Sequence, residues 1–117
     1  MTKKVHMYGI KNCDTVRKAI TWLNQKAIDC EFHDLKKEEL NEALINHWLN
    51  DVDRDVLINR RSQTWRKVPT VDKLLNDNKA IVKLITEHPT VLKRPVIYNG
   101  QFWSVGFSED AWDRLFL

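Results

Sequence analysis

The sequence contains little of what builds a disulfide scaffold, an internal redox pair or a membrane span. Its 117 residues include only two cysteines, Cys13 and Cys30, and a domain of this size folds without disulfides. Val16 stands three residues after Cys13, so there is no Cys-x-x-Cys pair to support an internal dithiol–disulfide cycle. No apolar run approaches the length of a membrane span, and the start of the chain lacks the apolar stretch of a signal peptide. We therefore expect one domain over residues 1–117, in the reducing cytoplasm, with no membrane partner.

The excess of one sign of charge over the other is also small. The net charge is +3, and basic residues are interleaved with acidic ones except near Arg60 and Arg94. Such a mild excess, without a basic stripe interleaved with aromatics, argues against a nucleic-acid partner. The histidines are scattered without the spacing of metal ligands, so we expect no metal site. They are His6, His33, His47 and His88.

The first third of the chain reads as strand, helix, strand. Strands are predicted at residues 5–8 and 30–35, and a helix begins at Cys13. The apolar stripe of this helix has helical spacing and consists of Val16, Ala19, Ile20, Leu23 and Ala27. A unit of this length predicts that its two strands are parallel.

A helical block is predicted to follow, at about residues 37–88. The apolar face of its first helix is expected to consist of Leu40, Ala43, Leu44, His47 and Trp48. A short helix at 53–58 begins with acidic residues, which the helix dipole favours there. Residues 59–68 are predicted to form a polar, arginine-rich loop.

Two more helices complete this block. Thr70 is the predicted N-cap of a helix at 71–75. Another helix carries the apolar residues of 81–85, with either Asn78 or Asp77 as its cap. Pro89 stops that helix, because proline cannot continue the backbone hydrogen-bond pattern.

The end of the chain reads as two strands and a helix. Strands at 95–98 and 102–105 are separated by Asn99-Gly100, a strong hairpin signal because both residues tolerate positive φ. Ser108 is suited to cap a last helix with an acidic first turn. The complete order predicts an α/β, thioredoxin-like fold: a four-stranded mixed sheet with a helical insertion between strands two and three.

Cys13 is the first candidate for chemistry because the first helix starts there. Free backbone N–H groups and the helix dipole stabilise a thiolate at such a position, and this lowers a cysteine pKa. Lys11 lies two residues before it and Arg17 four residues after it, which makes the site cationic. Position alone leaves a reactive thiol and an inert residue both open. Cys30, in a predicted buried strand, is interpreted as a small core residue.

Arginines supply the second set of candidates, because the guanidinium fork suits carboxylates and oxyanions. Arg60 and Arg61 lie in the predicted loop, and Arg94 precedes Pro95. A proline that opens a strand of a thioredoxin-like sheet is often cis and brings the preceding residue close to the thiol. A solvated surface charge is the competing interpretation for each arginine.

Four segments, in order along nearly the whole chain, resemble the motifs of a known family. They are residues 8–19 (YGIKNCDTVRKA), 57–66 (LINRRSQTWR), 87–96 (EHPTVLKRPV) and 105–109 (VGFSE). These segments are similar to those of the arsenate reductase (ArsC-like) family, in its YffB-type branch, which is related to the Spx regulators. The resemblance implies a thioredoxin fold with a nucleophilic cysteine, arginines that bind an oxyanion, and glutathione as the reductant.

Carried over by position, the resemblance makes Cys13 the nucleophile and Arg94 the arginine before the cis-proline. For the loop arginine it favours Arg61, with Arg60 second. The expected set that binds glutathione or substrate consists of Lys11, Asn12, Arg17, Arg60, Arg94 and Pro95. Arsenate reductases carry a histidine where this chain has Gly9 and a third arginine where it has Phe107, so inefficient arsenate reduction is expected.

Three functions follow from this interpretation. The leading hypothesis is a glutathione-dependent thiol–disulfide oxidoreductase, a monomer with no bound cofactor, glutathione as co-substrate, and a small anionic or disulfide substrate. The second is an Spx-like regulatory protein that contacts RNA polymerase. The third is arsenate reductase proper.

Overall fold

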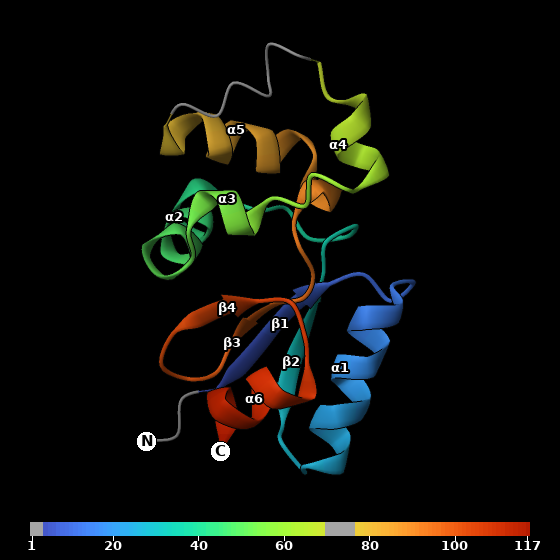
Figure 1. Ribbon diagram of the computed structural model, residues 1–117. Coiled ribbons are helices and arrows are strands. Elements are labelled where there is room, and N and C mark those ends of the chain that lie inside the picture. Colours follow the sequence, from blue (N-terminus) through green and yellow to red (C-terminus); the bar gives the residue numbers. More distant parts are fainter. Residues whose placement is uncertain (1–3, 70–76) are drawn as a thin grey trace.

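The protein folds around a four-stranded sheet, with a block of helices beyond one end of it (Figure 1). The computed structural model describes residues 4–69 and 77–117. In chain order the elements are β1 (Val5–Gly9), α1 (Asp14–Gln25), β2 (Cys30–Asp34), α2 (Glu42–Asp51), α3 (Arg54–Leu57), α4 (Gln63–Lys67), α5 (Asn78–Glu87), a 3-10 helix (Pro89–Val91), β3 (Val96–Tyr98), β4 (Trp103–Val105) and α6 (Glu109–Phe116). No helix within the two described ranges has the length and apolar character to cross a membrane.

The sheet has the order β2-β1-β3-β4 and is mixed. β1 pairs with β2 in parallel, as predicted, while β1 with β3 and β3 with β4 are antiparallel. The helices α2 to α5 are inserted between β2 and β3 (Figure 1). This confirms the predicted thioredoxin-like fold class.

Two hydrophobic clusters cover the two faces of the sheet. Val5 and Met7 of β1 point toward α1 and α6, where Trp22 meets Trp112 edge-on at 5.5 Å between ring centroids. Tyr8, of opposite parity, packs into the second cluster with the fully buried Trp48 of α2. Alternation along one strand therefore divides the core between the two sides.

The α1 stripe is confirmed except at its end. Val16, Ala19 and Leu23 are buried, and Ile20 is partly buried. Ala27 is exposed, with φ of 55°, because α1 ends at Gln25 and the chain turns there. The prediction that Ala27 belongs to the stripe was wrong.

The face predicted for α2 needs a correction. Ala43 and His47 are exposed, whereas Ile45 and Trp48 are buried. The cause is the helix start: Asn41 caps α2, so the buried Leu40 precedes the helix and does not set its phase.

Residues predicted as a polar loop contain a helix. Ser62 accepts a hydrogen bond from the Trp65 backbone N–H at 3.0 Å and so caps α4. Asp77, one of the two predicted alternatives, caps α5. The helix predicted at 71–75 with Thr70 as its cap lies outside the described residues.

The β3–β4 turn is longer than predicted. Tyr98 pairs with Trp103, so residues 99–102 form the connection, and β4 begins one residue later than expected. Gly100 has φ of 101°, while Asn99 contributes its side chain instead of a positive φ. The Asn99 Oδ1 atom accepts hydrogen bonds from the backbone N–H groups of Gln101 and Phe102, both at 2.9 Å.

Candidate active site

Cys13 joins the end of β1 to the start of α1. It is the N-cap residue of α1, with extended backbone (φ −115°, ψ 125°), and its carbonyl accepts the Arg17 N–H at 2.9 Å. Its side chain is partly buried and contacts both hydrophobic clusters. The sulfur therefore lies at the junction of the two halves of the core, where it still reaches solvent.

The surroundings of Cys13 favour its thiolate. Partial burial opposes the charged form, but the Val16 N–H, the Arg94 side chain and the Thr15 N–H all face the sulfur and outweigh that penalty. The positive charge of Arg94 acts in the same direction. The pKa of Cys13 consequently lies below the ordinary value of a thiol. The sulfur completes no conventional capping hydrogen bond, so these free N–H groups act on it as dipoles.

Arg94 reaches Cys13 because of the sheet topology. β3 runs antiparallel to β1, and its first residue, Val96, pairs with Tyr8 near the end of β1. The residues just before β3 therefore lie at the same end of the strands as the residues that follow β1. The peptide bond between Arg94 and Pro95 is cis, as the analogy with thioredoxin-like folds and the family resemblance implied. Pro95 is buried and Arg94 is half-buried.

A second layer of residues holds this arginine. Arg94 Nη1 donates to the Thr90 carbonyl oxygen at 2.9 Å. The Thr90 hydroxyl in turn lies 2.6 Å from that of Thr64 in α4. Sequence reasoning missed both threonines, because neither belongs to a spacing pattern; only the fold places them beside each other.

The arginine-rich loop is tied to the segment that leads to Arg94. Ile58 and Leu92 form a β-bridge, the Asn59 N–H donates to the Val91 carbonyl at 2.8 Å, and the Lys93 N–H donates to that of Leu57 at 2.8 Å. These bonds bring the loop beside the segment of residues 91–93. The loop is therefore positioned by backbone pairing.

The two loop arginines differ in their partners. Arg60 Nη2 lies 3.2 Å from Asp55 Oδ1, and its guanidinium lies 5.6 Å from the Trp65 ring centroid. Arg61 is exposed, and its backbone N–H donates to Asn59 Oδ1 at 3.0 Å. Neither guanidinium is joined to Cys13.

The predicted residues around the first turn are more dispersed than expected. Arg17 forms an ion pair with Asp14, so its charge is engaged on the outside of α1. Lys11 and Asn12 are exposed in the turn before Cys13. Among the predicted site residues, the structure thus brings only Arg94 onto the sulfur of Cys13.

Cys30 is the first residue of β2 and lies beside the start of β1, at the opposite end of that strand from Cys13. It pairs with Val5, about 13 Å along the strand from Gly9 at ~3.3 Å per residue, and both cysteines are free thiols. Burial, followed by the charge of Glu31, raises the pKa of Cys30 to about 11. This edge-strand residue is only partly buried, which corrects the expectation of a buried strand.

The expectation of scattered histidines also needs a correction. His6 and His33 are 27 residues apart, yet their ring nitrogens Nδ1 and Nε2 lie 3.0 Å from each other. The parallel pairing of β1 with β2 brings them together, which spacing along the chain does not reveal. The only available signal was the alternation of polar residues along both predicted strands.

Comparisons with known proteins agree with this geometry. The profile of the ArsC family matches residues 8–115. An uncharacterised protein of Haemophilus influenzae is 35% identical over 112 residues, which cover 96% of this chain and 98% of that protein. The global transcriptional regulator Spx of Streptococcus agalactiae is 29% identical, over 85% of this chain and 73% of its own. The solved structure of a YffB protein superposes with a TM-score of 0.91 at 32% identity, covering 97% of this chain and all of that one. The chain therefore belongs to the ArsC family.

Proposed function

We propose that this protein is a glutathione-dependent thiol–disulfide oxidoreductase whose nucleophile is Cys13. One observation carries the proposal: a partly buried cysteine at the start of α1 faces the guanidinium of Arg94, and its pKa is lowered. A thiolate at a cationic, accessible site is the species that attacks disulfides. Membership of the ArsC family supports a thiol-based reductase.

The proposed cycle uses one cysteine of the protein and two glutathione sulfurs. The Cys13 thiolate attacks the glutathione sulfur of a mixed disulfide R–S–SG, forming Cys13–S–SG and releasing R–S⁻, which takes up a proton. A second glutathione, as its thiolate, attacks the glutathione sulfur of this intermediate. Glutathione disulfide forms and the Cys13 thiolate is regenerated. The net reaction converts R–S–SG and GSH into R–SH and GSSG.

Cationic residues around the sulfur fit the anionic glutathione. Arg94 stabilises the attacking thiolate, and it does so again when Cys13 leaves as the thiolate in the second step. Arg61, Lys11 and Arg17 lie exposed near the start of α1 or on the loop beside residues 91–93. The side chains of Arg61 and Lys11 are available for the two glutathione carboxylates, whereas Arg17 is already paired with Asp14. A guanidinium group binds a carboxylate as a paired hydrogen-bond donor.

The test is turnover of a glutathione mixed disulfide, coupled to reduction of GSSG. Cys13→Ser removes the nucleophile and should abolish activity, while Cys30→Ser, the matched control, should retain it. Persistence of glutathione-linked reduction in Cys13→Ser would exclude this mechanism. A cytoplasmic location, where the glutathione pool is reducing, remains a prediction.

Arsenate is a poor substrate on this account. A Cβ atom added at Gly9 would lie 2.9 Å from Val16 Cγ2, so a histidine does not fit there without displacing α1. Phe107 packs edge-on against Trp112, with centroids 4.8 Å apart, and supplies no charge for an oxyanion. Each missing charge-assisted hydrogen bond weakens anion binding by about 1.5–3 kcal/mol. An arsenate-dependent, glutathione-coupled assay should therefore give little activity.

The similarity to Spx regulators supports a second candidate, contact with RNA polymerase. The cysteine pair expected of a redox switch is missing, because the second position is Val16, which is fully buried in the core. The missing pair argues against a redox switch of the Cys-x-x-Cys type, but it does not argue against binding to RNA polymerase. Capture of stoichiometric RNA polymerase subunits by the full chain, retained in Cys13→Ser, would favour this candidate over the enzyme.

A further inference from the structure

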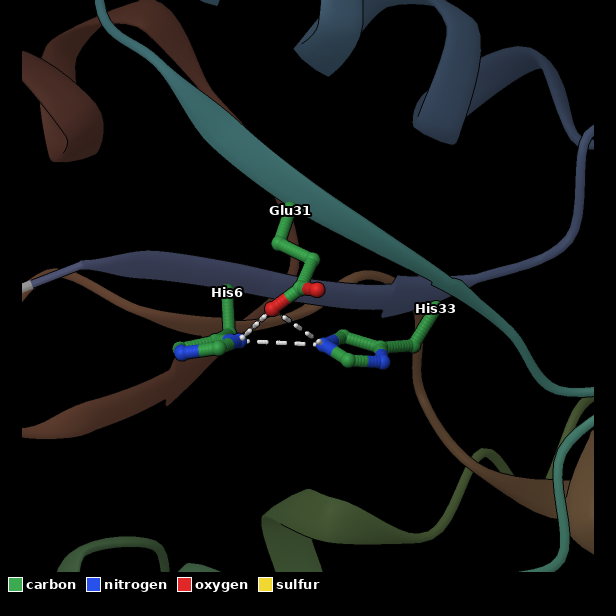
Figure 2. A group of neighbouring side chains, drawn as sticks. All are labelled: His6, Glu31 and His33. Atoms are coloured by element: carbon green, nitrogen blue, oxygen red, sulfur yellow. Dashed lines mark hydrogen bonds and ion pairs between the residues drawn. The ribbon is translucent and has the colours of Figure 1, made fainter.

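A cluster of three potential metal ligands lies on β1 and β2 (Figure 2). His6 Nδ1 is 3.0 Å from His33 Nε2 and 3.2 Å from Glu31 Oε2. His33 Nε2 is 3.7 Å from the same carboxylate oxygen. Figure 2 shows the three side chains converging from β1 and β2 on one point.

The register of the parallel strands creates this cluster. His6 pairs with Glu31, and Tyr8 pairs with His33. Paired residues of neighbouring strands share a face of the sheet, so all four side chains lie on the face opposite α1. On β2, Glu31 lies directly beside His6, and His33, two residues further along, is the diagonal neighbour of His6. The convergence is a consequence of the fold, since β1 and β2 are both regular strands.

Two further residues fix His33. Its Nδ1 atom lies 2.9 Å from Glu38 Oε1, and because an ionised carboxylate only accepts, Nδ1 carries the proton. In the neutral tautomer with this proton, the lone pair of Nε2 faces the cluster. Tyr8 stacks on the same ring, with centroids 4.3 Å apart and planes 10° apart. A carboxylate behind the imidazole is the arrangement that orients histidine ligands in metal sites.

We propose that His6, Glu31 and His33 bind a divalent transition-metal cation of the zinc class. Ligand atoms ~2.0–2.1 Å from a tetrahedral Zn²⁺ lie about 3.3 Å from each other. The three separations here, 3.0, 3.2 and 3.7 Å, bracket that value. Two imidazoles and one carboxylate form a three-ligand set that leaves the fourth position open to water or an exogenous ligand.

The protein that lacks a metal has its own stable arrangement. The His6 Nδ1–H then donates to His33 Nε2, so a proton occupies the place of the cation. Figure 2 shows the other ring nitrogen of His6 pointing away from the cluster, and the proton moves there when Nδ1 binds a metal. No net charge change on His6 is needed, because both neutral tautomers are available.

Access to the site is open. The side chain of Glu31 is 45% exposed, that of His6 30% and that of His33 15%. Lys4 Nζ lies 3.8 Å from Glu31 Oε2 and competes with a cation for this carboxylate. The lysine side chain is 61% exposed, so it can swing into solvent when a cation binds. The residues of the cluster are separate from those proposed to carry out thiol chemistry.

The experiment is calorimetric titration of the full chain with Zn²⁺, in a phosphine reductant that keeps thiols reduced. One Zn²⁺ per chain is expected, and the same stoichiometry in Cys13→Ser, because the site contains no sulfur. Co²⁺ should give visible bands of a four-coordinate N/O site without a sulfur-to-cobalt charge-transfer band. Loss of binding in Cys13→Ser, or absence of stoichiometric binding, would overturn the proposal.

Matched variants locate the ligands. His6→Gln and His33→Gln should remove stoichiometric binding, and Glu38→Gln should weaken it by about 10- to 100-fold through orientation of His33. The control His47→Gln changes an exposed histidine on α2 and should leave binding intact. Circular dichroism checks that each variant is folded. A second matched pair changes exposed glutamates: Glu31→Gln removes a proposed ligand, and Glu39→Gln is its control. Unchanged binding in the double variant His6→Gln/His33→Gln would refute the site.

Discussion

Arg94 faces the sulfur of Cys13 while its Nη1 atom donates a 2.9 Å hydrogen bond to the Thr90 carbonyl. The guanidinium is thus anchored on one side and stabilises a thiolate on the other. Partial burial of both side chains strengthens this attraction, because water screens it less than at an exposed site. The relationship makes Arg94 the principal electrostatic partner of the proposed nucleophile.

Arg94→Ala should therefore raise the pKa of Cys13 toward its ordinary value and slow its reaction at neutral pH. A charge-assisted hydrogen bond contributes about 1.5–3 kcal/mol, so we expect at least about a tenfold slower alkylation at pH 7. The measurement is the rate of iodoacetamide modification followed by mass spectrometry. Arg114→Ala, on the exposed face of α6, is the control and should react as the wild type does. Equal rates in both variants would contradict the role of Arg94.

Substitution of the two loop arginines, Arg60 and Arg61, should affect the KM for the substrate to different extents. Arg60 already pairs with Asp55 and stacks over Trp65, whereas the side chain of Arg61 is exposed beside the segment that leads to Arg94. We expect Arg61→Ala to raise KM for the glutathione mixed disulfide by about tenfold with a smaller change in kcat. Arg60→Ala should change KM by less. The reverse order would assign the anion-binding role to Arg60.

Gly9 should be intolerant of any side chain. Gly9→Ala places a Cβ 2.9 Å from Val16 Cγ2 and 3.2 Å from Cγ1, and overpacking of this kind costs about 1–3 kcal/mol. Urea unfolding measures the loss. The double variant Gly9→Ala/Val16→Ala should be less destabilised than the sum of the single variants, because removing the valine methyls relieves the clash. Additive effects would show that the two positions do not contact each other.

Much of the fold was accessible from local patterns. The β1–α1–β2 unit followed from Val16, Ala19 and Leu23 at helical spacing, which are buried as expected. The predicted cap at Ser108 was correct, and so was one of the two alternatives for α5, Asp77, because a capping side chain acts on its own first turn. Errors arose at Ala43 and His47, where the phase of a short helix depends on its unpredicted start.

Only part of the candidate site could be predicted from the sequence, for a physical reason. Cys13 is recognisable because its chemistry depends on its own helix. Its partner Arg94 was expected from the proline that follows it, by analogy with thioredoxin-like folds and by the family resemblance, and that peptide bond is cis. Thr90, which anchors Arg94, and the pairing of His6 with His33 depend on long-range sheet register. Spacing along the chain carries no information about that register until the strands are paired.

The most direct test of the account is the alkylation rate of Cys13 as a function of pH, measured in Cys30→Ser so that one thiol reports. Because the pKa is lowered, the thiolate fraction at pH 7 exceeds that of an ordinary thiol. The rate should therefore rise and level off at lower pH in the folded protein than in the same protein unfolded in urea. A folded-state midpoint equal to or above that of the unfolded chain would contradict the proposal that Cys13 is an activated nucleophile.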